Sequence, residues 1–250
     1  MAERMGRLAV VEGARPVIEA LRARRRRVHE IRLPRGDGSP ALRTLRDTAE
    51  QYGVQVIETA SGSGVTALAD PFLESSFEDL LSGPAPRRFV ALDGVTDIGN
   101  LGAIARTAEA SGITGLVLEE RRAPPVNPGA LRASAGALEH LPVARTPNLR
   151  RALGLARAEG LAILAAEPGG VFLERADPDL LCGEFILLLG SEDRGIRSGL
   201  RGLVQVRLGI RMCGRIESLG VAAAAAYLLV RLAELRDARE TGAKVNPGAE

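Results

Sequence analysis

The chain has 250 residues, of which 46% are hydrophobic, and its 33 lysines and arginines slightly outnumber its 31 aspartates and glutamates. This length suits one large α/β domain or a small domain followed by a medium one, and the apolar content with mixed charge excludes a disordered chain. The two cysteines, Cys182 and Cys213, have neither CxxC spacing nor neighbouring histidines, so we expect no disulfide framework and no metal site.

We expect no contact with a membrane. The N-terminus is charged throughout and lacks a signal-peptide core, and the longest apolar run, residues 221–230, is ended by Arg231. A membrane helix needs about 20 apolar residues, so this run fits a buried core helix better. The expected location of the protein is the cytoplasm.

Positive charge is concentrated near the N-terminus. Residues 1–35 contain ten arginines and four glutamates, an excess of six, so the remaining residues sum to −4 within the net charge of +2. Such a cluster fits contact with nucleic-acid phosphates. The alternative is a solvated helix end, where positive charge is favourable. The predicted nucleic-acid contacts in this cluster are Arg24, Arg25, Arg26 and Arg27.

The first 60 residues alternate between helical and strand patterns. Apolar spacing predicts a helix over residues 16–27, and period-two alternation predicts a strand over 28–34. A capped helix over 39–53 and a second strand over 54–60 follow. The unit is thus small, α/β and basic at one edge.

Gly, Ser and Pro clusters with weak periodicity occupy residues 61–88, and SGPAPRR at 82–88 is the best linker candidate. This pattern predicts a change of domain. The expected division is a small N-terminal domain at 1–80, a linker at 81–88, a larger domain at 89–236 and a tail at 237–250.

From residue 89 onward the strands are nearly continuously apolar, and each runs into a glycine-bearing loop and then a helix. Such strands are buried on both faces, which is typical of a parallel sheet covered by helices. Ligands of open parallel sheets bind outside the carboxyl ends of the strands. The predicted strands are 89–95, 115–120, 161–168 and 185–192.

The first loop of interest follows Asp93 and leads into a helix that we expect to begin near Asn100. Gly99 and Gly102 permit a close approach of the backbone to a ligand or another strand. Arg106 lies one and a half turns into the helix. Its side chain either has a functional role or forms an ion pair at the surface. The loop has neither GxGxxG spacing nor a P-loop lysine, so it does not indicate a nucleotide-phosphate cradle.

Two further loops follow later strands. In the first, the strand stops at Gly190, and the next turn contains Ser191, Glu192 and Gly195. Glu192 either contacts a ligand or simply caps the next helix. In the second, a glycine-rich loop leads to Ser218, which either caps the alanine-rich helix that follows or contacts a ligand.

Taken together and in this order, the three loops resemble the signature motifs of the SpoU (TrmH-type) family of RNA 2′-O-ribose methyltransferases, in the SPOUT superfamily. The first motif, Asn-x-Gly-x-x-x-Arg, is matched by Asn100, Gly102 and Arg106, and a Ser-x-Gly-Ala segment by Ser134, Gly136 and Ala137. The second motif, Gly-Ser-Glu-x-x-Gly, is matched by Gly190, Ser191, Glu192 and Gly195. The third is matched by Ile210, Met212, Gly214, Ser218 and Leu219. The resemblance covers residues 89–235.

This resemblance implies an α/β fold with an open parallel sheet and a C-terminal trefoil knot, a feature that sequence pattern alone does not predict. The N-terminal unit is similar, more loosely, to the small α/β ribosomal-protein-like substrate-binding domain of many members. TASGSGVTALADP stands where those members often have a His-Gln-Gly stretch.

The resemblance also implies S-adenosylmethionine as the cofactor and a homodimer. The implied cofactor-binding residues are Gly190, Ile210, Leu219, Met212, Gly214 and Leu189. The implied catalytic residues are Arg106, Asn100, Glu192 and Ser218, and Arg132 joins the predicted RNA contacts. The implied reaction is methyl transfer to a ribose 2′-hydroxyl, with ribosomal RNA preferred over transfer RNA as the substrate. Because a guanidinium titrates at about pH 12 or above, we assign Arg106 an orienting and charge-stabilising role.

Four positions depart from the family pattern. Gly220 stands in place of an asparagine, Ala222 of a serine, Arg211 of a proline and Ile98 of another proline. Glycine cannot make the hydrogen bonds of the asparagine, and loss of one catalytic hydrogen bond costs on the order of a hundredfold in rate. The alternative function is therefore a non-catalytic RNA-binding or ribosome-assembly protein of the same fold.

Overall fold

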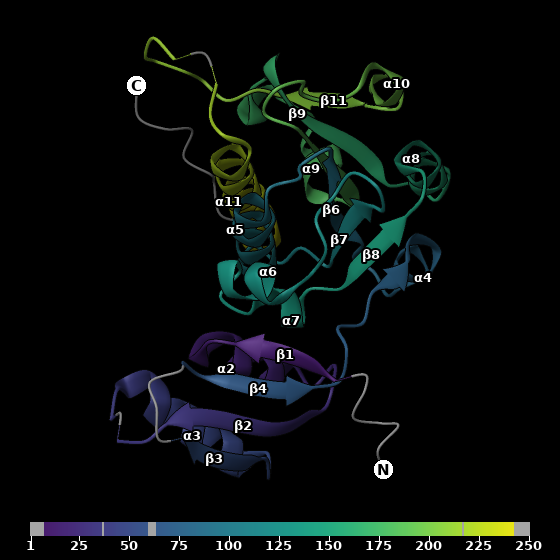
Figure 1. Ribbon diagram of the computed structural model, residues 1–250. Helices are drawn as coiled ribbons and strands as arrows, with labels where there is room; N and C mark the ends of the chain where they lie inside the picture. The colour runs from purple at the N-terminus through teal and green to yellow at the C-terminus, as the bar shows by residue number, and fades with distance from the viewer. Residues whose placement is uncertain (1–7, 37, 60–63, 217, 243–250) are drawn as a thin grey trace.

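The computed structural model describes residues 8–36, 38–59, 64–216 and 218–242. Two sheets build the molecule, and Figure 1 shows the smaller one, near the N-terminus, stacked below the larger one. Among the described helices, none is both long and apolar enough to cross a membrane.

The small unit is a four-stranded sheet in the order β1-β4-β2-β3, with β2 parallel to β3 and the other pairs antiparallel. Apolar side chains of its two helices, such as Val17 and Leu45, pack with Ile31 of the sheet into one core. Its elements are β1 (Ala9–Glu12), α2 (Ala14–Ala23), β2 (Val28–Pro34), α3 (Pro40–Gln51), β3 (Gln55–Thr59) and β4 (Thr66–Ala69).

The large unit is a seven-stranded sheet in the order β11-β9-β10-β6-β7-β8-β5, and every pair in it is parallel. This confirms the open parallel sheet. Its strands are β5 (Ser75–Ser76), β6 (Arg88–Asp93), β7 (Gly115–Glu119), β8 (Val143–Thr146), β9 (Ala162–Val171), β10 (Phe185–Gly190) and β11 (Val206–Leu208).

Helices cover both faces of the large sheet, because its strands are apolar on both sides and bury two separate clusters. One cluster includes α5 and α11, and the other includes α4 and α8. The helices are α4 (Phe77–Leu81), α5 (Ile98–Ala110), α6 (Pro128–Ala133), α7 (Ala137–His140), α8 (Leu149–Ala158), α9 (Pro178–Cys182), α10 (Ser198–Arg201) and α11 (Val221–Thr241), with a 3-10 turn, η1, at Leu173–Arg175.

The chain changes from one sheet to the other earlier than the sequence predicts. β5 pairs with β8 of the large sheet, and Phe77, Leu80 and Leu81 of α4 are buried in one of its two clusters. Residues 75–81 therefore pack with the large unit, although the weak periodicity of 61–88 favoured a linker at 81–88. The crossing segment is 70–74, between β4 and β5.

The basic cluster also differs from its prediction. Helix α2 ends at Ala23, and Arg24 takes a left-handed conformation with φ of 53° as its C-cap. Arg24 and Arg27 are exposed, whereas Arg25 is half-buried, and desolvation lowers the pKa of its guanidinium against the opposing effect of Glu139. The turn thus points its arginines in different directions.

Arg26 is buried between the two units. Its guanidinium forms a two-pronged ion pair with Glu139 of α7, with 3.0 Å between Nε and Oε2, and both side chains are 2% exposed. Nη1 donates to the Asp70 carbonyl at 3.0 Å, and the guanidinium lies 5.7 Å from the centre of the Phe72 ring. The prediction that Arg26 contacts RNA is therefore wrong, because its donors are already used inside the protein.

Glu139→Gln should destabilise the fold by about 3–5 kcal/mol, because it leaves the Arg26 charge buried without a counter-charge. Urea unfolding measures the change. Glu58→Gln is the matched control: Glu58 is 41% exposed and forms surface ion pairs with Arg46 and Arg35, so the change should cost less than about 1 kcal/mol. Equal losses in the two variants would contradict a structural role for the buried pair.

Candidate functional site

The three predicted loops meet at the carboxyl edge of the large sheet. Strand β10 lies between β9 and β6, and β11 lies beyond β9, so the loops that follow β10 and β11 are neighbours (Figure 1). Helix α5 follows β6 at the same edge, and helix α11 packs beside α5. Residues nearly 100 positions apart in the chain are thereby brought together.

A cavity of about 440 Å³ opens between these loops. Its volume lies within the usual range of small-molecule sites, roughly 300–1,000 Å³. Five of the six predicted cofactor residues line it, and Gly214 is not among them. The lining includes Leu189, Gly190, Ser191, Glu192 and Gly195 after β10, Ile210, Met212, Ser218 and Leu219 after β11, Ala166, Glu167 and Pro168 of β9, and Val221, Ala224 and Leu228 of α11.

Glycines make the cavity wall by letting the backbone fold back on itself. A Cβ on Gly190 would lie 2.3 Å from the carbonyl carbon of Gly195, and Gly195 has a φ of +62°. The turn is closed by the Gly195 amide, which donates to the Ser191 carbonyl at 2.8 Å. The end of β10 and the start of the next loop therefore approach each other more closely than any side chain allows.

The Glu192 carboxylate joins the three loops. Its Oε1 accepts a hydrogen bond from the Val221 amide at 3.0 Å and a longer one from Asn100 Nδ2 at 3.4 Å. Helix α11 has Gly220 at its N-cap position and no side-chain cap of its own there. Glu192 thus satisfies a free amide of α11, and its negative charge is favourable at this helix end.

Two sequence interpretations of this region are corrected. Ser218 does not cap α11, because the helix begins only at Val221; its side chain instead lines the cavity. Glu192 does cap a helix, but α11 rather than α10, the next helix in the chain. A Cβ on Gly220 would lie 3.1 Å from Glu192 Oε1, so the carboxylate stands close to where a side chain at 220 would begin.

Helix α5 carries the first motif. It begins at Ile98, earlier than predicted, because the Asp97 side chain caps it by accepting from the Asn100 amide at 2.7 Å. Gly102 does not approach a ligand or a strand: a Cβ there would lie 2.4 Å from Ala133 Cβ of α6. Arg106 is exposed, and no residue of the described chain pairs with it, so the surface ion pair is not formed.

An ion-pair network that the sequence did not predict lies behind the loop after β10. Arg197 Nε contacts Asp93 Oδ1 at 2.5 Å, and its Nη2 contacts Glu119 Oε2 at 2.7 Å. Asp93 and Glu119 are buried at the ends of β6 and β7. The sequence did contain a signal for this network, because two carboxylates at the ends of buried strands predict a basic partner for each buried charge.

The remaining predicted RNA contact, Arg132, is 63% exposed and pairs with Glu12 of β1 at 2.7 Å. Arg132 is therefore engaged in an ion pair with the small unit, whereas Arg24 and Arg27 are exposed to solvent. Within the described ranges, no three His, Cys, Asp or Glu side chains gather closely enough to hold a metal ion.

Gly190→Ala should lower the stability of the fold by about 1–3 kcal/mol and weaken binding of S-adenosylmethionine, because the new methyl group collides with backbone atoms. Gly154→Ala is the control, since its Cβ would meet nothing within 4 Å in the middle of α8. It should instead stabilise the fold by about 0.5–1 kcal/mol. Denaturant unfolding measures the stability, and calorimetric titration measures the binding. Unimpaired binding by Gly190→Ala would show that the turn at 190–195 does not contribute to the cofactor site.

The chain resembles known proteins over most of its length. The model of the SpoU rRNA Methylase family matches residues 87–230. A protein of Mycolicibacterium gilvum described as an uncharacterized tRNA/rRNA methyltransferase is 33% identical over 246 residues, which cover 91% of this chain and 76% of that protein. A protein of Archaeoglobus fulgidus with the same description is 32% identical over 201 residues, 79% of this chain and 87% of that protein.

Solved structures agree with these matches. The SpoU methyltransferase AviRb from Streptomyces viridochromogenes, in complex with the cofactor AdoMet, superposes with a TM-score of 0.76 at 25% identity, covering 94% of this chain and 93% of AviRb. An RNA methyltransferase of the TrmH family from Porphyromonas gingivalis gives 0.71 at 27% identity over 91% and 90% of the two chains. The family match and the shared fold lead to one conclusion: this chain belongs to the SpoU rRNA methylase family and is an RNA methyltransferase.

Proposed function

We propose that the protein transfers a methyl group from S-adenosylmethionine to a ribose 2′-hydroxyl of ribosomal RNA. The observation that carries this proposal is the single cavity lined by residues of the second and third motifs and joined through Glu192 to the first. A tritiated-methyl transfer assay on unmodified ribosomal RNA tests it, followed by mapping of the methylated ribose. Transfer to a base, or to transfer RNA alone, would contradict it.

The cavity residues fit S-adenosylmethionine. Leu189, Ile210 and Leu228 supply apolar surface for a purine, and the glycine turn at 190–195 leaves backbone groups open to it. When bound, this cofactor supplies an electrophilic methyl group on a sulfonium. The carboxylates of Glu167 and Glu192 also line the cavity and suit a ligand that carries positive charge.

The residues of the first motif then act on the RNA. Arg106 is exposed and unpaired within the described chain, so its guanidinium is available to hold a phosphate and the target hydroxyl. Asn100 and Glu192 contact each other and orient the target beside the cavity, which Ser218 also lines. Holding a ribose oxygen in line with the methyl carbon is the main task of these groups.

The finer features of the fold belong to the same proposal. The passage of the chain from β11, at one edge of the sheet, to α11, packed beside α5, supports a C-terminal trefoil knot. The α/β fold of the small unit, with Arg24 and Arg27 exposed, supports its role as the substrate-binding domain. Modification of ribosomal RNA would place the protein in the cytoplasm.

A non-catalytic RNA-binding or assembly role is the second candidate, and Gly220 favours it. Glycine offers no polar side chain at a position where relatives carry an asparagine, and the Glu192 carboxylate already bonds to the Val221 amide next to it. Cofactor titration beside the transfer assay separates the two candidates. Tight binding without transfer supports the second, and transfer supports the first.

Arg106→Ala should reduce methyl transfer by about a hundredfold or more while the dissociation constant for S-adenosylmethionine stays unchanged, because Arg106 does not line the cavity. Arg157→Ala is the control: Arg157 is also exposed, on α8, and the change should leave transfer intact. Normal transfer by Arg106→Ala would take this arginine out of the mechanism.

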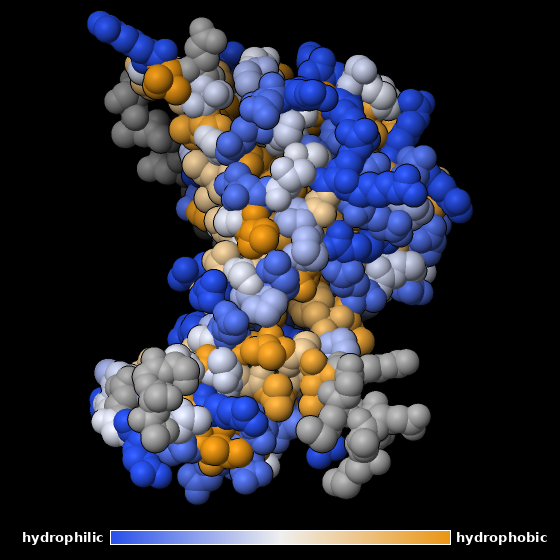
Figure 2. Space-filling model, viewed as in Figure 1, coloured by the Kyte–Doolittle hydropathy of each residue, from blue (hydrophilic) through white to orange (hydrophobic). Residues whose placement is uncertain are grey.

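The protein is proposed to act as a homodimer through α11. This helix buries Ala225, Leu228 and Leu229 on one side and exposes Tyr227 and Val230, 42% and 46% accessible, on another. Figure 2 shows apolar surface over this helix. An unpartnered apolar stripe on a core helix suits contact with a second copy.

Tyr227→Glu combined with Val230→Glu should therefore convert the dimer to a monomer in sedimentation experiments and lower transfer. Leu73→Glu introduces the same charge at another exposed apolar residue and should leave the assembly state unchanged. An unaltered sedimentation coefficient for the double variant would rule out this helix as the interface.

A further inference from the structure

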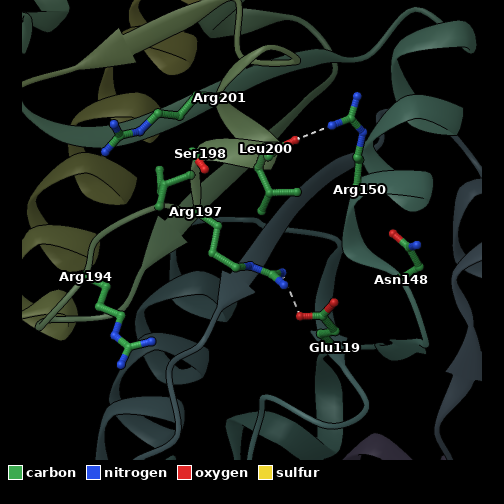
Figure 3. Close-up of a pocket in the computed structure, with 10 residues that line it drawn as sticks. Glu119, Asn148, Arg150, Arg194, Arg197, Ser198, Leu200 and Arg201 are labelled. Carbon is green, nitrogen blue, oxygen red and sulfur yellow. Dashed lines mark hydrogen bonds and ion pairs between the residues drawn. The ribbon is translucent and has the colours of Figure 1, made fainter.

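A second hollow, of about 570 Å³, lies next to the cofactor cavity and is rich in arginine. Its walls come from the start of α8 and from the segment between β10 and α10 (Figure 3). Adjacent residues of one loop separate the two spaces, since Gly195 lines the cofactor cavity and Ile196 lines the hollow. The lining residues are Glu119, Asn148, Arg150, Arg194, Ile196, Arg197, Ser198, Gly199, Leu200 and Arg201.

Two of the four arginines in the hollow form ion pairs with carboxylates. Arg197 pairs with Asp93 and Glu119, and Arg201 pairs at 3.1 Å with Glu167, which lines the cofactor cavity. These two side chains hold the loop and the sheet edge in place. They contribute little free charge to the hollow.

The charges of the other two arginines are not balanced by a carboxylate of the described residues. Arg150 donates from Nη1 to the Gly199 carbonyl at 2.9 Å, a neutral acceptor that leaves most of its five N–H groups open. The guanidinium of Arg194 has no partner among the described residues, and the residue is exposed on the loop after β10. Figure 2 shows strongly hydrophilic surface over α8, the helix that carries Arg150, and over α10.

The place of Arg150 is unfavourable for helix stability. Arg150 and Arg151 lie in the first turn of α8, which holds no acidic residue, so two cations face the positive end of the helix dipole. Arg151 comes within 4.0 Å of Glu78, whereas no carboxylate of the described residues pairs with Arg150. A bound anion would relieve this repulsion and would accept from the planar guanidinium groups.

We propose that this hollow binds phosphates of the RNA backbone beside the target nucleotide, with Arg150 and Arg194 as the contacts. The proposal deepens, and rests on, the function proposed above. RNA that presents a ribose to the cofactor cavity must pass the sheet edge where the hollow opens, because one loop forms a wall of both. The two arginines hold the flanking strand and so position the target.

The test uses the full-length protein with Arg150→Gln and Arg194→Gln combined, and an unmodified ribosomal RNA transcript as the probe. Each lost phosphate contact lowers the slope of log affinity against log salt by about 0.7–0.9. The double variant should therefore lose about 1.4–1.8 from the slope measured between about 50 and 200 mM salt, and bind about 25- to 60-fold more weakly at about 100 mM. Its affinity for S-adenosylmethionine should be unchanged.

Two further variants make the result decisive. Arg157→Gln removes one exposed charge from the far end of α8 and should leave the slope unaltered. Arg150→Lys with Arg194→Lys keeps both charges and should restore most of the slope, which damage to the fold would not allow. A slope in the double glutamine variant equal to that of Arg157→Gln overturns the proposal. Absence of methyl transfer by the unaltered protein would instead overturn the proposed function, and the salt slopes would still decide the role of the hollow.

Discussion

The hydrogen bond from the Val221 amide to Glu192 Oε1 is the contact on which the site depends. Helix α11 starts with free amides and no cap from its own sequence, so the loop after β10 must supply the acceptor. Through the same oxygen that loop reaches Asn100 on α5. One carboxylate thus links α5, α11 and the loop after β10 around a common space.

The rest of the site follows from close backbone approach at the edge of a parallel sheet. The turn at 190–195 is possible only with glycine, and Gly170 and Gly209 allow a similar crossing, since a Cβ on Gly209 would lie 2.5 Å from the Gly170 carbonyl oxygen. These contacts bring the backbone segments at the edge of β9, β10 and β11 close together beside the cavity. Arginine ion pairs then hold the neighbouring loop against the sheet, as Arg197 does with Asp93 and Glu119.

Local pattern predicted the parts of the fold that rest on local chemistry. The buried strands β6, β7, β9 and β10 and the motif loops were predicted, because apolar runs and glycine turns are visible in a short window. β1, β4, β5 and β8 were missed, because strands of two to four residues owe their structure to distant partners. Arg26 shows the same limit: four consecutive arginines look alike in sequence, and only the fold brings Glu139 to one of them.

That buried pair has a consequence for how the two units work together. A rotation of the small unit away from the large one would separate Arg26 from Glu139 and leave two buried charges without partners. Hinge motion at this junction is therefore strongly disfavoured. The separation between the small unit and the cofactor cavity is then set when the protein folds. A ligand that touched both units would meet them at one fixed spacing.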